Sequence, residues 1–211
     1  MKLMQSLGKL VAVAALMWFG SAGAAELGKD YNRLASPQAT ASGDRIEVLE
    51  FFFYGCSHCY HLHPQFEAWA AKKPKDVQVT LVPTAFRDSW LPMAYTFYAL
   101  EALGQREKLH DALYQAWNVQ NADLSDLGRI SAFVGQRGVD RKAFDSAYNS
   151  FTVQSKVMRS QQMVQGYRIM GTPTLIVDGR YSITGLQPAD TIRVLNDVLD
   201  VVRKERAAKK R

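Results

Sequence analysis

The stretch "RIEVLEFFFYGCSHCYHLHPQF", residues 45–66, decides the predicted fold, because a strand pattern changes into a helix pattern at a pair of cysteines. Residues 45–53 are rich in β-branched and aromatic side chains, which predicts a buried strand. From residue 57 to about residue 73, apolar side chains recur at the three- and four-residue spacing of a helix. Cys56 and Cys59, the only cysteines of the chain, therefore lie where a strand leads into a helix.

The rest of the chain continues this alternation and predicts an α/β fold. Residues 77–84 alternate as a second strand, close enough to the first helix for a right-handed parallel βαβ unit. A long helical region follows over about residues 90–166, with breaks expected at Gly104, 118–123 and 135–140. Residues 173–184 predict two strands joined by an Asp-Gly turn, and an amphipathic helix begins near Pro188.

The first 24 residues are typical of a secretory signal peptide. A basic start is followed by an apolar run over residues 10–20 and by the small residues Ala22-Gly23-Ala24. An uncleaved anchor is the alternative, but a spanning helix needs about 20 apolar residues. Cleavage after Ala24 would leave 211 − 24 = 187 residues and, without Lys2 and Lys9, a net charge of +6 − 2 = +4. The basic tail, residues 203–211, is expected to be a solvated, frayed helix end rather than a membrane or nucleic-acid binding segment.

Three kinds of chemistry compete for the cysteine pair. As a structural disulfide, the pair would close a loop so short that it would stabilise the fold by only about 2 kcal/mol. As a metal site, the thiolates could be joined by His61 or His63, but no second ligand pair is evident, and both histidines are expected on the surface. Tyr60 after the second cysteine excludes the C-x-x-C-H haem attachment pattern.

Redox chemistry has a physical mechanism at this position. Unpaired backbone N–H groups and the positive end of the macrodipole at a helix N-terminus both favour a thiolate. We therefore expect Cys56 to be the acidic, exposed thiol and Cys59, one turn into the helix, to be shielded. His58 lies between them and would add a hydrogen-bond donor. Only the reduced protein contains the thiolate, so its stabilisation makes the disulfide an oxidant.

The whole pattern resembles the DsbA family of periplasmic thiol:disulfide oxidoreductases. A strand ending in Phe-Phe, C-x-H-C-Y opening a helix, a helical insertion, and G-x-P before a hairpin and a final helix carry the resemblance. It implies a thioredoxin fold with an inserted all-helical domain. Residues 25–87 and 167–211 would form the thioredoxin-like domain and residues 88–166 the insertion.

The resemblance also implies roles for individual residues. Cys56 would be the nucleophile, His58 its stabiliser and Cys59 the resolving thiol. The "GTPT" segment resembles the family's cis-proline loop, in which Thr172 and Pro173 would face the disulfide and bind an extended substrate strand.

Three further positions depend on this comparison. Ser57 and Thr172 stand where the best-known members have proline and valine, so both are expected to tune the redox centre. Glu50 lies in the apolar strand and resembles a buried acid of the family that accepts a proton from the second cysteine. Burial would raise its pKa, which is typical of functional carboxyls.

The predicted function is therefore a monomeric periplasmic oxidase that introduces disulfides into reduced, unfolded exported polypeptides. Reoxidation would come from a DsbB-like membrane quinone reductase, with no cofactor, metal or nucleic acid involved. A thiol reductase or disulfide isomerase is the alternative, and a metal carrier or chaperone is a further one. Some aromatic and methionine side chains could line a polypeptide groove, although their helical spacing is also typical of a core: Tyr54, Trp90, Met93, Tyr95 and Met170.

Overall fold

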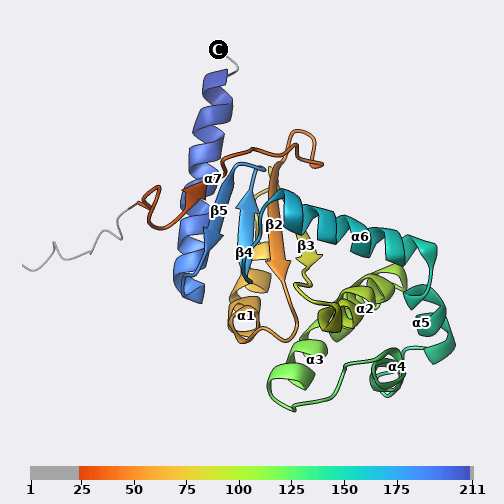
Figure 1. Ribbon diagram of the computed structural model, residues 1–211. Coiled ribbons are helices and arrows are strands. Elements are labelled where there is room, and N and C mark those ends of the chain that lie inside the picture. The colour runs from red at the N-terminus through yellow and green to blue at the C-terminus, as the bar shows by residue number, and fades with distance from the viewer. Residues whose placement is uncertain (1–23, 210–211) are drawn as a thin grey trace, which may run out of the picture.

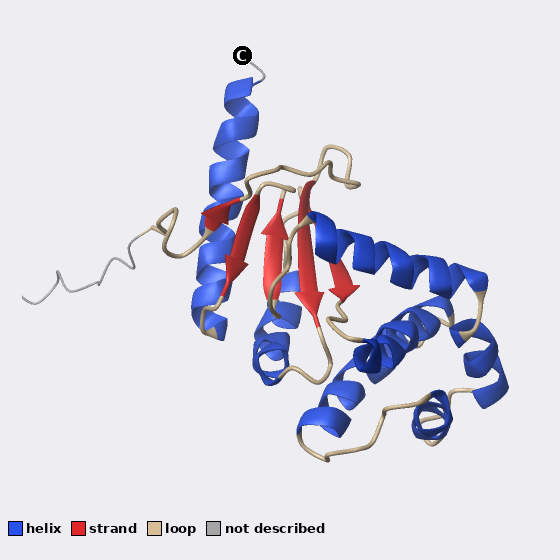
Figure 2. Ribbon diagram, viewed as in Figure 1, coloured by secondary structure: helices blue, strands red, loops and turns tan. Residues whose placement is uncertain are grey.

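A computed structural model describes residues 24–209 (Figure 1). The strands are β1 (Asn32–Arg33), β2 (Ile46–Phe52), β3 (Val77–Pro83), β4 (Thr174–Val177) and β5 (Tyr181–Thr184). The helices are α1 (Ser57–Ala71), the short 3₁₀ helix η1 (Asp88–Trp90), α2 (Leu91–Ala102), α3 (Arg106–Asn118), α4 (Leu127–Gly135), α5 (Arg141–Tyr148), α6 (Phe151–Gly166) and α7 (Pro188–Lys209). The strands gather in one sheet and α2 to α5 lie to one side of it (Figure 2).

The sheet confirms the predicted α/β order. Its strand order is β1-β5-β4-β2-β3, in which β2 and β3 are parallel while β4 is antiparallel to β2 and to β5. Asp178 and Gly179 form the turn between β4 and β5 with φ of 55° and 62°, the left-handed region that a two-residue hairpin requires. The short strand β1, which pairs with β5, was not expected, because two residues give no periodicity.

Strand β2 is buried along its whole length because both of its faces are covered. Val48 and Phe52 belong to the large core that includes side chains of α1, α3 and α7, whereas Leu49 and Phe51 belong to a smaller cluster with Val164 of α6. Both faces of the strand therefore carry apolar side chains, as in strands that lie between two layers, and Glu47 and Glu50 are the exceptions. Its carboxyl end carries the loop with the two cysteines.

The helical region breaks where glycine and polar signals predicted, with one exception. Helix α2 ends before Gly104, whose φ of 64° suits glycine. The break between α5 and α6 was missed, and Ser150 caps α6 there by accepting a hydrogen bond from the Val153 N–H at 3.2 Å. One core cluster includes both Leu62 of α1 and Leu100 of α2, so the division into 25–87 with 167–211 and 88–166 stays a proposal.

The basic tail is helical as far as the structure describes it. Helix α7 continues to Lys209 and its last described residues are exposed, but two of its arginines have acidic partners elsewhere in the fold. Arg203 binds Asp76 at 2.8 Å, and Arg206 forms an ion pair with the buried carboxylate of Asp178. Sequence alone could not reveal these partners, which lie far from the tail in the chain.

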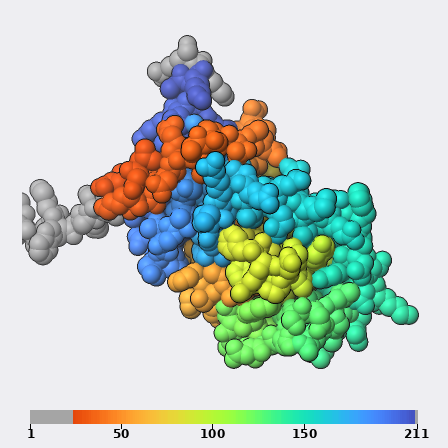
Figure 3. All heavy atoms as spheres, in the orientation of Figure 1, coloured from red at the N-terminus to blue at the C-terminus, as the bar shows by residue number. Residues whose placement is uncertain are grey.

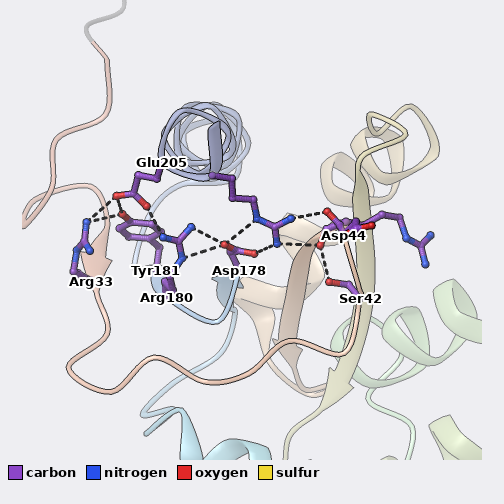
Figure 4. A network of polar contacts seen from close by, with 9 residues as sticks. Arg33, Ser42, Asp44, Asp178, Arg180, Tyr181 and Glu205 are labelled. Carbon is purple, nitrogen blue, oxygen red and sulfur yellow. Dashed lines mark hydrogen bonds and ion pairs between the residues drawn. The ribbon is translucent and has the colours of Figure 1, made fainter. Parts of the chain in front are cut away.

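Asp178 belongs to a polar network that ties α7 to the β4–β5 hairpin (Figure 4). Arg180 binds Asp178 and Glu205, each at 2.6 Å, and Glu205 also accepts hydrogen bonds from Arg33 and Tyr181. Because β4 runs antiparallel to β2, this network lies at the end of the sheet opposite the cysteine loop. It fixes α7 without taking part in the redox site.

The segment that precedes β2 lies across the sheet and α7, in red and orange in Figure 3. The Gln38 N–H donates to the Gly179 carbonyl at 2.9 Å and so joins this segment to the hairpin. The signal peptide predicted for residues 1–24 falls, except for Ala24, outside the described residues. Within residues 24–209, no helix has the length and apolar character needed to cross a membrane.

Candidate redox site

The loop between β2 and α1 is held by aromatic side chains of the helical region. Phe53 stacks on Trp90 with ring centroids 3.9 Å apart, and Trp117 meets it edge-on at 5.4 Å. A side chain at Gly55 would lie 2.5 Å from the Trp117 indole nitrogen, so only glycine lets the loop pass here. The Cys56 N–H donates to the Phe53 carbonyl at 3.0 Å, which closes the turn into the helix.

The two cysteines differ in exposure as predicted. Cys56 is the N-cap of α1, with extended backbone and a half-buried thiol, whereas Cys59 has none of its surface exposed. Both are free thiols, so the structure is that of the reduced protein. Ser57 and His58, between them, are exposed. An incoming sulfur can therefore reach Cys56 but not Cys59.

The surroundings of Cys56 lower its thiol pKa from 9.0 to about 5. The largest cause is a hydrogen bond from the Cys59 thiol, which outweighs the opposing effect of burial. The Thr172 side chain and the backbone N–H groups of Cys59 and His58 add further donors. The contribution of His58 seen here comes from its backbone, while the stabilising role of its imidazole stays a prediction.

The pKa of the Cys59 thiol shifts in the opposite direction. Burial raises its pKa well above 9.0, and its hydrogen bond to Cys56, the Cys56 charge and the Glu50 charge raise it further. The reduced pair is therefore one thiolate and one thiol rather than two thiols. Each unit of pKa shift corresponds to about 1.4 kcal/mol.

Glu50 is buried below this pair, with 3 % of its surface exposed. Burial, with a smaller effect from the charge of Glu67, raises its pKa to about 8. Its Oε1 has no hydrogen-bond partner among the described residues, and the neighbour opposite it on β3 is Leu81. A carboxyl in this environment holds its proton near neutral pH and can exchange it with a nearby sulfur.

The loop before β4 faces Cys56 across the site. The Thr172–Pro173 peptide is cis, as expected, and the Cys56 thiol lies 3.2 Å from the Thr172 carbonyl oxygen. Beside them is a surface pocket of 250 Å³. Its walls include His58, Leu62, Thr172, Pro173, Leu186 and Gln187.

Several side chains lie elsewhere than expected or were not noticed. His63 was expected on the surface, but 6 % of it is exposed, because Pro64 does not end α1 and the helix turns His63 towards α3. Tyr54 and Met93 each have 1 % of their surface exposed and are core residues rather than groove residues, whereas Met170 is 91 % exposed. The part played by Trp117 was missed, since no local pattern links it to a loop so far away.

Among the described residues, one group of three side chains could hold a metal ion. They are His63, Glu67 and His110, where α1 packs against α3, and neither cysteine belongs to the group. The expectation that the cysteine pair itself would not form a metal site is not tested by this geometry.

Comparisons with known proteins agree with the geometry. The profile of the family described as "DSBA-like thioredoxin domain" matches residues 47–195. A thiol:disulfide interchange protein DsbA of Burkholderia cepacia is 39 % identical over 210 residues, covering 99 % of each chain. The corresponding protein of Pseudomonas aeruginosa is 32 % identical over 208 residues, covering 96 % of each.

Solved structures give the same result. The crystal structure of Pseudomonas aeruginosa DsbA has a TM-score of 0.82 at 31 % identity, covering 89 % of this chain and 97 % of that one. The oxidoreductase DsbA from Xylella fastidiosa has a TM-score of 0.81 at 29 % identity, covering 86 % and 100 %. These similarities confirm the predicted thioredoxin fold.

The first prediction concerns the thiolate. Ultraviolet thiolate absorbance of the reduced protein should titrate with a midpoint near pH 5. In Thr172→Val the midpoint should rise by about one unit, since one donor to the charged sulfur is lost. Ser125→Ala, at an exposed position between α3 and α4, should leave it unchanged. A midpoint near 9.0 in the parent protein would contradict the account.

The second prediction concerns Glu50, whose folded-state pKa of about 8 exceeds the reference value of 4.5. Ionisation is therefore disfavoured in the fold, and the destabilisation grows as pH rises from 4.5 to about 8. In the disulfide form, Glu50→Gln should increase the free energy of unfolding by on the order of 4 kcal/mol at pH 8 and little at pH 4.

Urea unfolding at the two pH values measures this difference. Glu107→Gln, at an exposed acid of α3, serves as the control and should change neither value by more than about 0.5 kcal/mol. If Glu50→Gln has the same effect at both pH values, the carboxyl of Glu50 is not perturbed by burial.

Proposed function

The chain belongs to the family of DsbA-like thioredoxin domains, and from this we propose that it donates its Cys56–Cys59 disulfide to reduced polypeptides. It is a thiol:disulfide oxidoreductase. The observation that carries the proposed direction is the pKa of Cys56, lowered to about 5 in the reduced protein. Opening the disulfide creates this stabilised thiolate. The reduced protein is therefore lower in free energy, which favours transfer of the disulfide to a substrate.

The proposed reaction begins with a substrate thiolate attacking the Sγ atom of Cys56. The new sulfur–sulfur bond joins substrate and Cys56 as the bond to Cys59 breaks, and Cys59 takes up a proton. A second substrate thiolate then attacks the substrate sulfur of this mixed disulfide and releases Cys56 as a thiolate. Two electrons pass from the substrate dithiol to the protein, and the substrate gains one disulfide.

Glu50 is proposed to supply the proton that Cys59 takes up. With its pKa raised to about 8, the carboxyl is mostly protonated at neutral pH, and its ionised form raises the pKa of Cys59, which favours return of the proton to that sulfur. When the dithiol is oxidised again, the same carboxylate accepts the proton back. Burial from solvent makes an internal donor useful, because water does not reach the sulfur of Cys59.

Substrate binding is proposed at Thr172 and Pro173. They adjoin Cys56 and form part of the wall of the 250 Å³ pocket together with Leu62 and Leu186. An extended polypeptide placed there would have its sulfur near Cys56 and an apolar side chain in the pocket. The exposed His58, which also lines this pocket, would contact the bound substrate.

The cellular setting follows from the same proposal. We place the monomer in the periplasm, where it meets exported polypeptides before they fold, and where a DsbB-like quinone reductase of the membrane reoxidises it. The signal pattern of residues 1–24 supports export, and disulfides persist in such oxidising compartments.

A trapping experiment tests the assignment of the two sulfurs. Reduced Cys59→Ser protein, mixed with a peptide that carries a disulfide, should accumulate a mixed disulfide because Cys56 attacks and nothing resolves the product. Cys56→Ser should form none, since Cys59 is buried. Non-reducing electrophoresis with mass spectrometry measures the adduct.

The disulfide form of the parent protein should also oxidise a dithiol peptide, and Cys56→Ser should lose this activity entirely. His61→Ala, at an exposed histidine of α1, is the matched control and should retain it. A dithiol peptide that stays reduced in the presence of excess disulfide-form protein would contradict the proposed direction. Equal adduct from both serine variants would contradict the proposed roles.

A further inference from the structure

Two buried histidines and an acid meet behind the redox site, where α1 packs against α3. His63 and Glu67 are four residues apart on α1, and His110 lies on α3. One ligand atom from each of these three side chains lies within 4.8 Å of the other two. The redox mechanism uses neither histidine, while Glu67 contributes to the raised pKa of Glu50.

Each imidazole is already oriented through one of its ring nitrogens. Nε2 of His63 lies 2.5 Å from Oδ1 of Asp111, and Nδ1 of His110 lies 2.6 Å from the hydroxyl of Tyr54. The other nitrogen of each ring is then left for a further partner. Histidines that ligate metals are commonly held in this way, with one nitrogen on the ion and the other donating to a carboxylate or another oxygen.

Two of the three side chains reach the surface of the protein. His63 and Glu67 contribute to the wall of a surface pocket of 420 Å³, through which an ion and a water ligand can approach, whereas His110 is buried and is not part of that wall. The positive charge of Arg106 acts on His110 and lowers its pKa. Arg106 also forms ion pairs with Glu101 and Glu107, and these two carboxylates offset the positive charge near the cluster.

We propose that His63, Glu67 and His110 form a binding site for a divalent transition-metal ion of the zinc class, independent of the two cysteines. Three protein ligands and one water complete the tetrahedral set that Zn²⁺ favours. Ligand atoms around such an ion are about 3.4 Å apart, given bond lengths near 2.1 Å. The three ligand atoms lie within 4.8 Å of one another, so metal binding requires them to move closer, and the exposed side chain of Glu67 is the one with most room to do so.

The donor set also determines which ions should bind. Imidazole nitrogen with carboxylate oxygen suits Zn²⁺, Co²⁺ and Cu²⁺, whereas Ca²⁺ and Mg²⁺ require mostly oxygen ligands. Local patterns offer little indication of this site, because His110 is far from the other two residues in the chain and His63 was expected to be exposed.

Calorimetric titration with zinc chloride tests the proposal in the full chain carrying Cys56→Ser and Cys59→Ser, which removes both thiols. We expect one Zn²⁺ per chain and no heat with calcium chloride. Glu67→Gln should weaken Zn²⁺ binding at least about tenfold, and His63→Gln about 100-fold. Co²⁺ should give the visible absorption of a tetrahedral site, and this band should disappear in Glu67→Gln.

Matched controls keep the result specific. Glu26→Gln and Asp88→Asn, at exposed acids outside α1 and α3, should bind Zn²⁺ within about twofold of the parent, as expected for sites away from the ligands. Circular dichroism checks the fold of His63→Gln, and the exposed Glu67 carries the test if that variant unfolds. Unchanged affinity in Glu67→Gln, equal loss in Asp88→Asn, or no binding at millimolar Zn²⁺ would overturn the proposal.

Discussion

The hydrogen bond from the Cys59 thiol to the Cys56 thiolate is the interaction on which the function of this protein depends. It exists only when the disulfide is open, and it is the largest cause of the low pKa of Cys56. The same contact, with burial, raises the pKa of Cys59. One proton shared unequally between two sulfurs therefore stabilises the reduced state and weakens the disulfide.

The rest of the fold maintains that asymmetry. Strand β2 places Glu50 beneath the sulfurs and delivers the loop to the N-terminus of α1, where backbone N–H groups point at Cys56. The stacked rings of Phe53 and Trp90 join this loop to the helical region, so that region supports the redox centre directly. At the far end of the sheet, the ion pairs of Asp178 hold α7 in place.

Sequence predicted those parts of the structure that local patterns determine. The strand-to-helix position of Cys56, the burial of Cys59 and the Asp178-Gly179 turn follow from periodicity and turn chemistry. Contacts between distant segments did not follow, such as the meeting of His63 with His110. The stabilisation of Cys56 was also attributed first to the helix terminus, because the geometry of a thiol-to-thiolate hydrogen bond has no signal in the sequence.

The equilibrium of the protein with reduced and oxidised glutathione tests the central claim most directly. If the thiolate is stabilised as described, the Cys56–Cys59 disulfide should be more oxidising than the glutathione couple, and the protein should be largely reduced even when oxidised glutathione predominates. Each 30 mV difference in potential corresponds to about 1.4 kcal/mol. A disulfide that persists in excess reduced glutathione would show that the bridged state is the stable one, and the account would be wrong.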